Sequence, residues 1–208
     1  MARWRGVVAG TALLALVTLV AGAASGPSQV VSTLNGTLLD VLKQAEKLGY
    51  QGRYDRLRPV MADVFDLDFM GEKSLGRHWK GLGEDDRKRW IAVFREFTTA
   101  NYAANFDQYS GQSFELLGEE PGGNETTLVK TRVVNPGGEN VELSYRLQRS
   151  GESWRIVDVY LKGTVSELAL RRSDYSSLIE REGFEALVTT LRGKIADLAA
   201  GRGKRESV

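Results

Sequence analysis

The sequence predicts an α+β domain, because its apolar residues follow a helical period, then an alternating one, and then a helical period again. The first helical part covers about residues 27–109, the alternating part residues 113–161, and the last helical part residues 165–200. Short turns divide the alternating part into four strands, and short turns join antiparallel neighbours. We therefore expect a four-stranded antiparallel sheet packed against N- and C-terminal helices.

The first helix is predicted by apolar residues spaced three and four apart, from Val30 to Leu48. Pro27 suits its opening and Gly49 its end. Residues 53–64 and 66–78 read less clearly as two shorter helices.

A long helix is then predicted from the acidic start Glu84–Asp86 to about Tyr109. Acidic residues are favourable at a helix N-terminus, where the macrodipole is positive.

The strands are expected at residues 113–118, 126–135, 141–148 and 153–161. Along the third strand Leu143, Tyr145 and Leu147 fall on one face, with polar residues between them. Two further helices, residues 165–180 and 184–200, are predicted to follow. Helices against a twisted sheet enclose a cone-shaped interior, which a ligand can occupy if side chains do not fill it.

Residues 1–24 have the features of a secretory signal peptide. Arg3 and Arg5 make a basic start, residues 7–20 form an uncharged apolar run, and small residues allow cleavage after Ala23 or Ala24. The alternative is an uncleaved anchor, but a spanning helix needs about 20 apolar residues. We expect an exported mature domain over residues 25–200, free in solution, and a disordered tail over residues 201–208.

Composition excludes several classes of function. The chain has no cysteine, which leaves no disulfide, no thiolate metal site and no thiol for a lipid anchor. Its 28 basic and 27 acidic residues nearly balance, whereas nucleic-acid binding needs a concentrated basic face. We expect no nucleic-acid partner.

Catalytic and cofactor motifs are missing. His78 is the only histidine, and there is no cysteine. A catalytic triad would have to use His78, and a zinc site of three or four ligands lacks the histidines and cysteines that it needs. Asp63, Asp66 and Asp68 lack the glycine and closing glutamate of a calcium loop. No phosphate-binding glycine motif occurs. We expect no cofactor and no metal, and we do not expect an enzyme.

Asp158 is the one acidic residue that we consider for a catalytic role. It interrupts an otherwise apolar strand end, and a carboxylate on the concave face of a sheet can act as a general base. A strand-end acid bonded to backbone groups or to an arginine is the plainer alternative.

Four segments carry a family resemblance. Residues 154–166, WRIVDVYLKGTVS, resemble a segment of the MlaC-type, or toluene-tolerance, family of periplasmic lipid-binding proteins of ABC transport systems. Residues 171–188 resemble the block that follows it, and residues 65–70 and 102–110 are a looser match in the same order. The resemblance covers about Val30 to Leu198. Residues 164–172 and 76–79 look more like the branch associated with hopanoid biosynthesis, so a polycyclic triterpenoid is as plausible a ligand as a phospholipid.

The resemblance implies an enlarged NTF2-like cone that binds lipid between sheet and helices. It also implies an inner-membrane ABC transporter complex, and an outer-membrane complex, as partners. The candidate lipid-binding residues are Phe65, Phe69, Phe94, Phe97, Tyr102 and Phe106 from helices and Leu143, Tyr145, Leu147, Trp154 and Ile156 from strands. For each of them ordinary core packing is the alternative, and the competing functions are an enzyme using Asp158 or a scaffold without a ligand.

Overall fold

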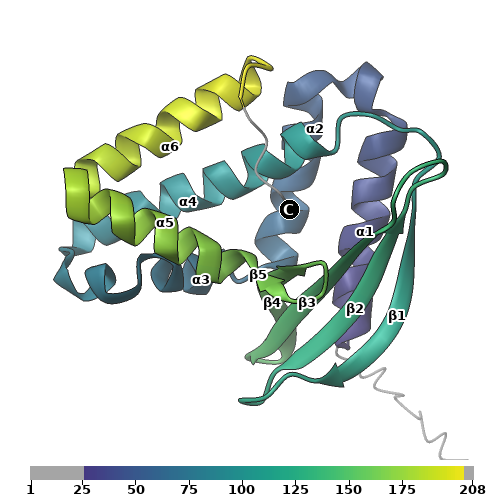
Figure 1. Ribbon diagram of the computed structural model, residues 1–208, viewed down its shortest axis with the longest axis horizontal. Helices are drawn as coiled ribbons and strands as arrows, with labels where there is room; N and C mark the ends of the chain where they lie inside the picture. Colours follow the sequence, from purple (N-terminus) through teal and green to yellow (C-terminus); the bar gives the residue numbers. More distant parts are fainter. Residues whose placement is uncertain (1–25, 204–208) are drawn as a thin grey trace, which may run out of the picture.

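A computed structural model describes residues 26–203 of the chain (Figure 1). The predicted signal peptide and the last five residues lie outside the described part. The order of elements is four N-terminal α-helices with a short 3₁₀ helix, five strands and two C-terminal helices. Helices and an antiparallel sheet in this order confirm the α+β prediction.

Helices α1 (Pro27–Lys43) and α2 (Ala45–Val64) divide the N-terminal segment differently from the prediction. The chain turns at Gln44, not at Gly49, and the second helix continues through a kink at Gly49 (φ 59°). A glycine with positive φ tolerates the kink without a steric penalty from Cβ. The apolar spacing continues across the turn, which is why the two helices read as one.

The next helices bring the chain back to the sheet. Helix α3 (Leu67–Leu75) leads into the 3₁₀ helix η1 (Gly76–Gly81), and helix α4 (Glu84–Asn105) follows. Helix α4 ends four residues before the predicted Tyr109. It begins with three acids, as expected, and its Trp90 side chain donates a 2.8 Å hydrogen bond to the Gly71 carbonyl of α3.

The strands are antiparallel and lie in sequence order across one sheet. Their bounds are β1 (Ser113–Pro121), β2 (Thr127–Val134), β3 (Val141–Ser150), β4 (Ser153–Leu161) and β5 (Val165–Ser166).

The prediction of four strands is wrong because β5 pairs with the end of β4. Lys162 and Gly163 take positive φ values and turn the chain back, so that Val165 lies opposite Leu161. Two residues are too few to produce an alternating pattern, and the sequence therefore assigns them to the helix that follows.

Helices α5 (Glu167–Glu182) and α6 (Phe184–Ala199) complete the fold. Figure 1 shows α1 along one face of the sheet, while α3, α4, α5 and α6 gather beyond the β4 edge. The edge of β4 is covered by β5 and by a bridge in which the Asp66 N–H donates to the Ile156 carbonyl at 2.9 Å. The hydrophobic core lies between these helices and the inner face of the sheet. The NTF2-like cone stays a prediction.

Candidate lipid-binding site

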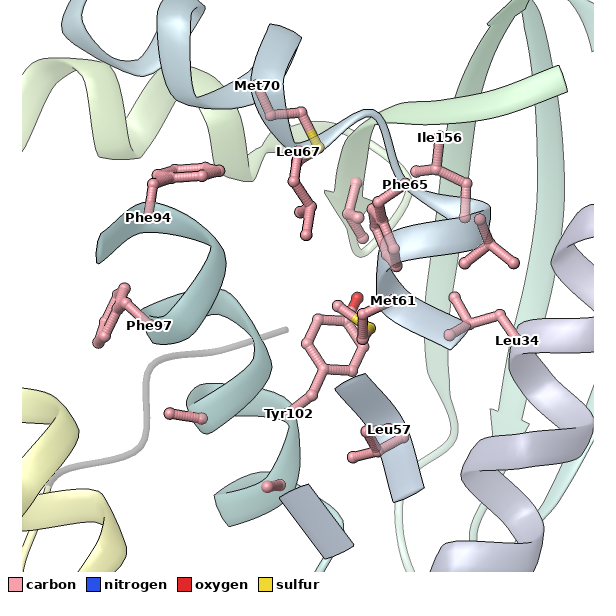
Figure 2. Close-up of a cluster of buried hydrophobic side chains, with 14 of the residues drawn as sticks. Leu34, Leu57, Met61, Phe65, Leu67, Met70, Phe94, Phe97, Tyr102 and Ile156 are labelled. Atoms are coloured by element: carbon pink, nitrogen blue, oxygen red, sulfur yellow. The ribbon is translucent and has the colours of Figure 1, made fainter. Parts of the chain in front are cut away.

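One wall of the candidate site comes from the helices. Phe94, Thr98 and Tyr102 are spaced four residues apart on α4 and therefore lie on one face of that helix. Phe65, at the end of α2, places its ring 5.8 Å from Tyr102 at an angle of 69°. Figure 2 shows these rings with Met70 of α3, converging on one apolar cluster.

The opposite wall is the inner face of β3 and β4. Leu143, Tyr145 and Leu147 alternate toward the core, as predicted, and all are buried. Tyr145 lies opposite Val159, and Leu147 lies opposite Ile156. The two walls form what we call the seam: the contact between the α2–α5 helices and the inner face of β3 and β4.

A β-bulge at Val157 decides which side chains of β4 reach the seam. The register shifts between Leu147↔Ile156 and Arg146↔Asp158, so that Val157 is the extra residue. A bulge reverses the alternation of side chains beyond it. Val159 therefore joins Ile156 on the inner face, and Asp158 faces outward with Arg146.

The seam encloses a cavity of about 20 Å³. A cavity needs roughly 10–15 Å³ to hold one water, and ligand pockets commonly measure about 300–1,000 Å³. Its lining residues are Phe65, Met70, Phe94, Thr98, Tyr102, Val159, Glu167, Leu168 and Arg171. In this conformation the seam is closed, and a lipid needs the two walls to separate.

Two charged residues lie at the border of this apolar lining. Glu167 and Arg171 are four residues apart on α5 and both are buried. The Arg171 guanidinium lies 5.3 Å from the centre of the Phe97 ring. Charged groups are expensive to bury far from partners or water, so this end of the seam is where polar groups approach the interior.

The two tyrosines of the seam are held neutral by burial. Desolvation raises the pKa of Tyr102 well above its usual range, and the neighbouring Tyr145 acts in the same direction. Burial alone raises the pKa of Tyr145. Both phenols therefore stay protonated near neutral pH.

The structure brings most of the predicted site residues together. Nine of them are buried in one continuous core: Phe65, Phe94, Phe97, Tyr102, Phe106, Leu143, Tyr145, Leu147 and Ile156. The other two, Phe69 and Trp154, are half-buried at its margins. Phe69 lies under the Lys73 ammonium and Trp154 under the Arg149 guanidinium. Contact of any of these residues with lipid stays a prediction.

Sequence reasoning missed several residues of the cavity lining. Val159 was missed because strict alternation from Ile156 places it on the outer face of the sheet. The sequence has no pattern that predicts the bulge. Met70 lies within residues 65–70, which carry the family resemblance, and Leu168 lies within residues 164–172, which resemble the hopanoid-associated branch. Both are at apolar positions of helices, α3 and α5. The helical spacing of those two residues was the available signal.

Asp158 does not face the seam. Its carboxylate accepts hydrogen bonds from the Val159 N–H at 2.9 Å, the Ser166 hydroxyl at 2.7 Å and the Leu168 N–H at 3.1 Å. Ser166 in turn accepts from the Ala169 N–H at the start of α5. Asp158 thus ties strand β4 to the N-terminus of α5, which removes the reason for assigning it a general-base role in the interior.

Other chemistry is sparse in the described part of the chain. His78 lies in η1 with its Nε2 3.5 Å from Glu180. Among residues 26–203 no three histidine or acidic side chains are grouped so as to hold a metal ion. None of the helices described has the length and apolar character needed to cross a membrane.

A comparison with protein-family models places the chain in a known family. The family model described as "MlaC protein" matches residues 32–193, from within α1 to within α6. The chain belongs to the MlaC family. This confirms the family resemblance seen in residues 65–70, 102–110, 154–166 and 171–188.

Two known proteins extend the comparison. The chain is 24% identical over 184 residues to the intermembrane phospholipid transport system binding protein MlaC of Haemophilus influenzae, with 85% of this chain and 86% of that protein covered. A phospholipid-binding protein from Ralstonia solanacearum, solved in complex with a phospholipid, superposes with a TM-score of 0.73 at 20% identity. That match covers 84% of this chain and 99% of the other, and it shows the shared fold.

Proposed function

We propose that this MlaC-family protein is a periplasmic lipid carrier that takes the acyl chains of a phospholipid into the seam. The observation that carries the proposal is a seam lined on both walls by apolar side chains from separate layers of the fold. The phospholipid named for the Haemophilus influenzae relative, and the one bound by the Ralstonia solanacearum protein, support the choice of ligand.

The closed seam is the expected form of such a carrier without cargo. An empty apolar void of about 1,000 Å³, the upper end of ligand pockets, would cost on the order of 24 kcal/mol at ~24 cal/mol per Å³. Whole domains are stable by only about 5–15 kcal/mol. A dry void of lipid size would therefore cost more than the stability of a whole domain, so a seam without lipid must either admit water or bring its walls together. The small volume of the seam fits the second case.

The energetics of exchange fit a shuttle. Each methylene withdrawn from water contributes roughly 0.8 kcal/mol, so two chains of about 15 methylenes contribute on the order of 24 kcal/mol. A bilayer offers nearly the same gain, and the carrier need only match it. We expect loading and release to require membrane complexes, namely an inner-membrane ABC transporter and an outer-membrane complex, which lower the barrier to opening.

The enzyme alternative has little support, because the outward carboxylate of Asp158 already accepts three hydrogen bonds. A hopanoid is the competing cargo, from the resemblance of residues 76–79 and 164–172 to that branch. A rigid ring system would need a wider opening of the same walls than flexible acyl chains.

Native mass spectrometry of protein purified without detergent tests the proposal. We expect bound phospholipid, identified by extraction, and uptake of phospholipid from vesicles by delipidated protein. Vesicles doped with a hopanoid form the second arm of the experiment. Preferential uptake of the hopanoid would mean that a hopanoid, and not a phospholipid, is the cargo. Protein that carries no lipid and takes none from either vesicle would overturn the carrier assignment.

A further inference from the structure

A second hollow, of about 470 Å³, lies outside the seam at the β4 edge. We call it the edge pocket. Its floor is the outer face of β3 and β4 with Arg146, Asp158 and Tyr160, and its sides are helices α3 and α5. The turn between β1 and β2 contributes Asn124 to the rim. Its size falls within the range of small-molecule sites, about 300–1,000 Å³.

The charges of the edge pocket are unbalanced. Three cations line it, Lys73, Arg146 and Arg172, against the single acid Asp158. That acid is 6% exposed, and its oxygens accept from a hydroxyl and two backbone N–H groups. The pocket therefore presents net positive charge to a ligand.

The two arginines are available for an anion. Within residues 26–203 neither Arg146 nor Arg172 forms an ion pair, and the Arg146 Nε has no hydrogen-bond partner. Arg146 is held over the Tyr160 ring at 5.0 Å, and the stem of Arg172 runs past Gly76. Guanidinium groups bind phosphate oxygens in a bidentate manner. Lys73, paired with Glu72 at 2.7 Å, contributes as a point charge.

The edge pocket adjoins the seam through one residue. Leu168, in the first turn of α5, lines both the 470 Å³ pocket and the 20 Å³ cavity. Phe69 and Val157 add apolar surface on the pocket side of Leu168. The charged and the apolar linings therefore meet at Leu168, where a molecule with a phosphate at one end and acyl chains at the other would pass from one to the other.

From this shared border we infer that the edge pocket binds the phosphate of the lipid headgroup, with Arg146 and Arg172 as its ligands, while the acyl chains pass Leu168 into the seam. The inference rests on the proposed carrier function and assigns it an entrance and a headgroup chemistry. Selectivity then has two parts: the seam accepts chains of any phospholipid, and the edge pocket distinguishes lipids with a phosphate from those without one.

The test compares two fluorescent lipids with identical chains, phosphatidylglycerol and diacylglycerol, delivered from cyclodextrin to delipidated protein. We expect wild type to bind phosphatidylglycerol more tightly. The double variant Arg146→Gln/Arg172→Gln should lose that preference, with phosphatidylglycerol affinity falling ~10- to 100-fold, as expected for lost charge-assisted hydrogen bonds. Its affinity for diacylglycerol should be unchanged, which also reports correct folding.

The matched control is Arg58→Gln/Arg192→Gln, which removes the same charge from exposed positions on α2 and α6. It should retain the preference, and Arg146→Lys/Arg172→Lys should restore part of it. Equal binding of both lipids by wild type, or an equal loss in the control, overturns the inference while leaving a carrier. Binding of neither lipid overturns the carrier function as well. Inorganic phosphate bound in the pocket, with phosphatidylglycerol affinity unaffected by the double variant, would mean a free-anion site and would also overturn it.

Discussion

The seam and the edge pocket are two hollows that share Leu168 and differ in volume and in the polarity of their linings. The seam is mainly apolar and measures about 20 Å³, whereas the edge pocket carries several charges and measures about 470 Å³. Apolar walls without cargo gain free energy by meeting, because contact removes their surface from water. Charged walls lose hydration if they meet. Under the proposed function, the open and charged edge pocket serves polar recognition, and the acyl chains enter the nearly closed, mainly apolar seam.

The largest expected difference between the seam and the edge pocket comes from replacing one phenylalanine in each by alanine. Phe94→Ala in the seam should lower the free energy of unfolding by about 3–5 kcal/mol, as is usual for a buried aromatic residue. Phe69→Ala, at the half-buried edge-pocket position, should cost clearly less. Urea unfolding of delipidated protein measures both values. Equal losses would mean that the seam is not the better packed region.

The loss of stability at alkaline pH compares a tyrosine of the seam with one of the edge pocket. Burial raises the pKa of Tyr145 in the seam, while burial and the adjacent Asp158 raise the pKa of Tyr160 in the edge pocket. A raised pKa means that the unfolded chain loses its proton first, so stability falls above about pH 10. The loss reaches up to ~1.4 kcal/mol per pH unit for the buried Tyr145 and is smaller for Tyr160, where solvent screens the charge.

Tyr145→Phe should therefore remove more of the alkaline loss than Tyr160→Phe, since Tyr145 is buried and Tyr160 only half-buried. Thermal or urea unfolding between pH 9 and pH 11 measures the slope for each variant. A steeper change in the Tyr160 variant would contradict the assigned difference in burial.

The smallest expected effect concerns the link between the two regions. Ser166→Ala removes the N-cap of α5 and one donor to Asp158, at a cost of about 1 kcal/mol. Ser173→Ala on the exposed part of the same helix is the control and should be nearly neutral. A loss no larger than that of the control would show that the cap does not hold α5 against β4.

Periodicity predicted the parts of the fold that depend on one repeated pattern. The alternation of Leu143, Tyr145 and Leu147 gave the inner face of β3 correctly, and the stripe of α4 gave the helix wall. The pattern could not show the turn at Gln44, because apolar spacing runs across it. Nor could it show β5, because two residues hold no period.

The site was predictable as a set of apolar residues and not as a geometry. The Val157 bulge moved Val159 inward and Asp158 outward, and a bulge depends on backbone pairing that the sequence does not display. The edge pocket was also hidden, since Lys73, Arg146 and Arg172 come from three separate elements and meet only in the folded chain.

The central claim, that lipid chains enter the closed seam, is tested most directly by photo-crosslinking. A phospholipid with a diazirine in one acyl chain is loaded from vesicles, irradiated, and its attachment sites are mapped by mass spectrometry. The account predicts attachment to seam residues such as Phe65, Phe94, Tyr102 and Val159. Attachment confined to the outer face of the sheet, or to the edge pocket, would contradict it.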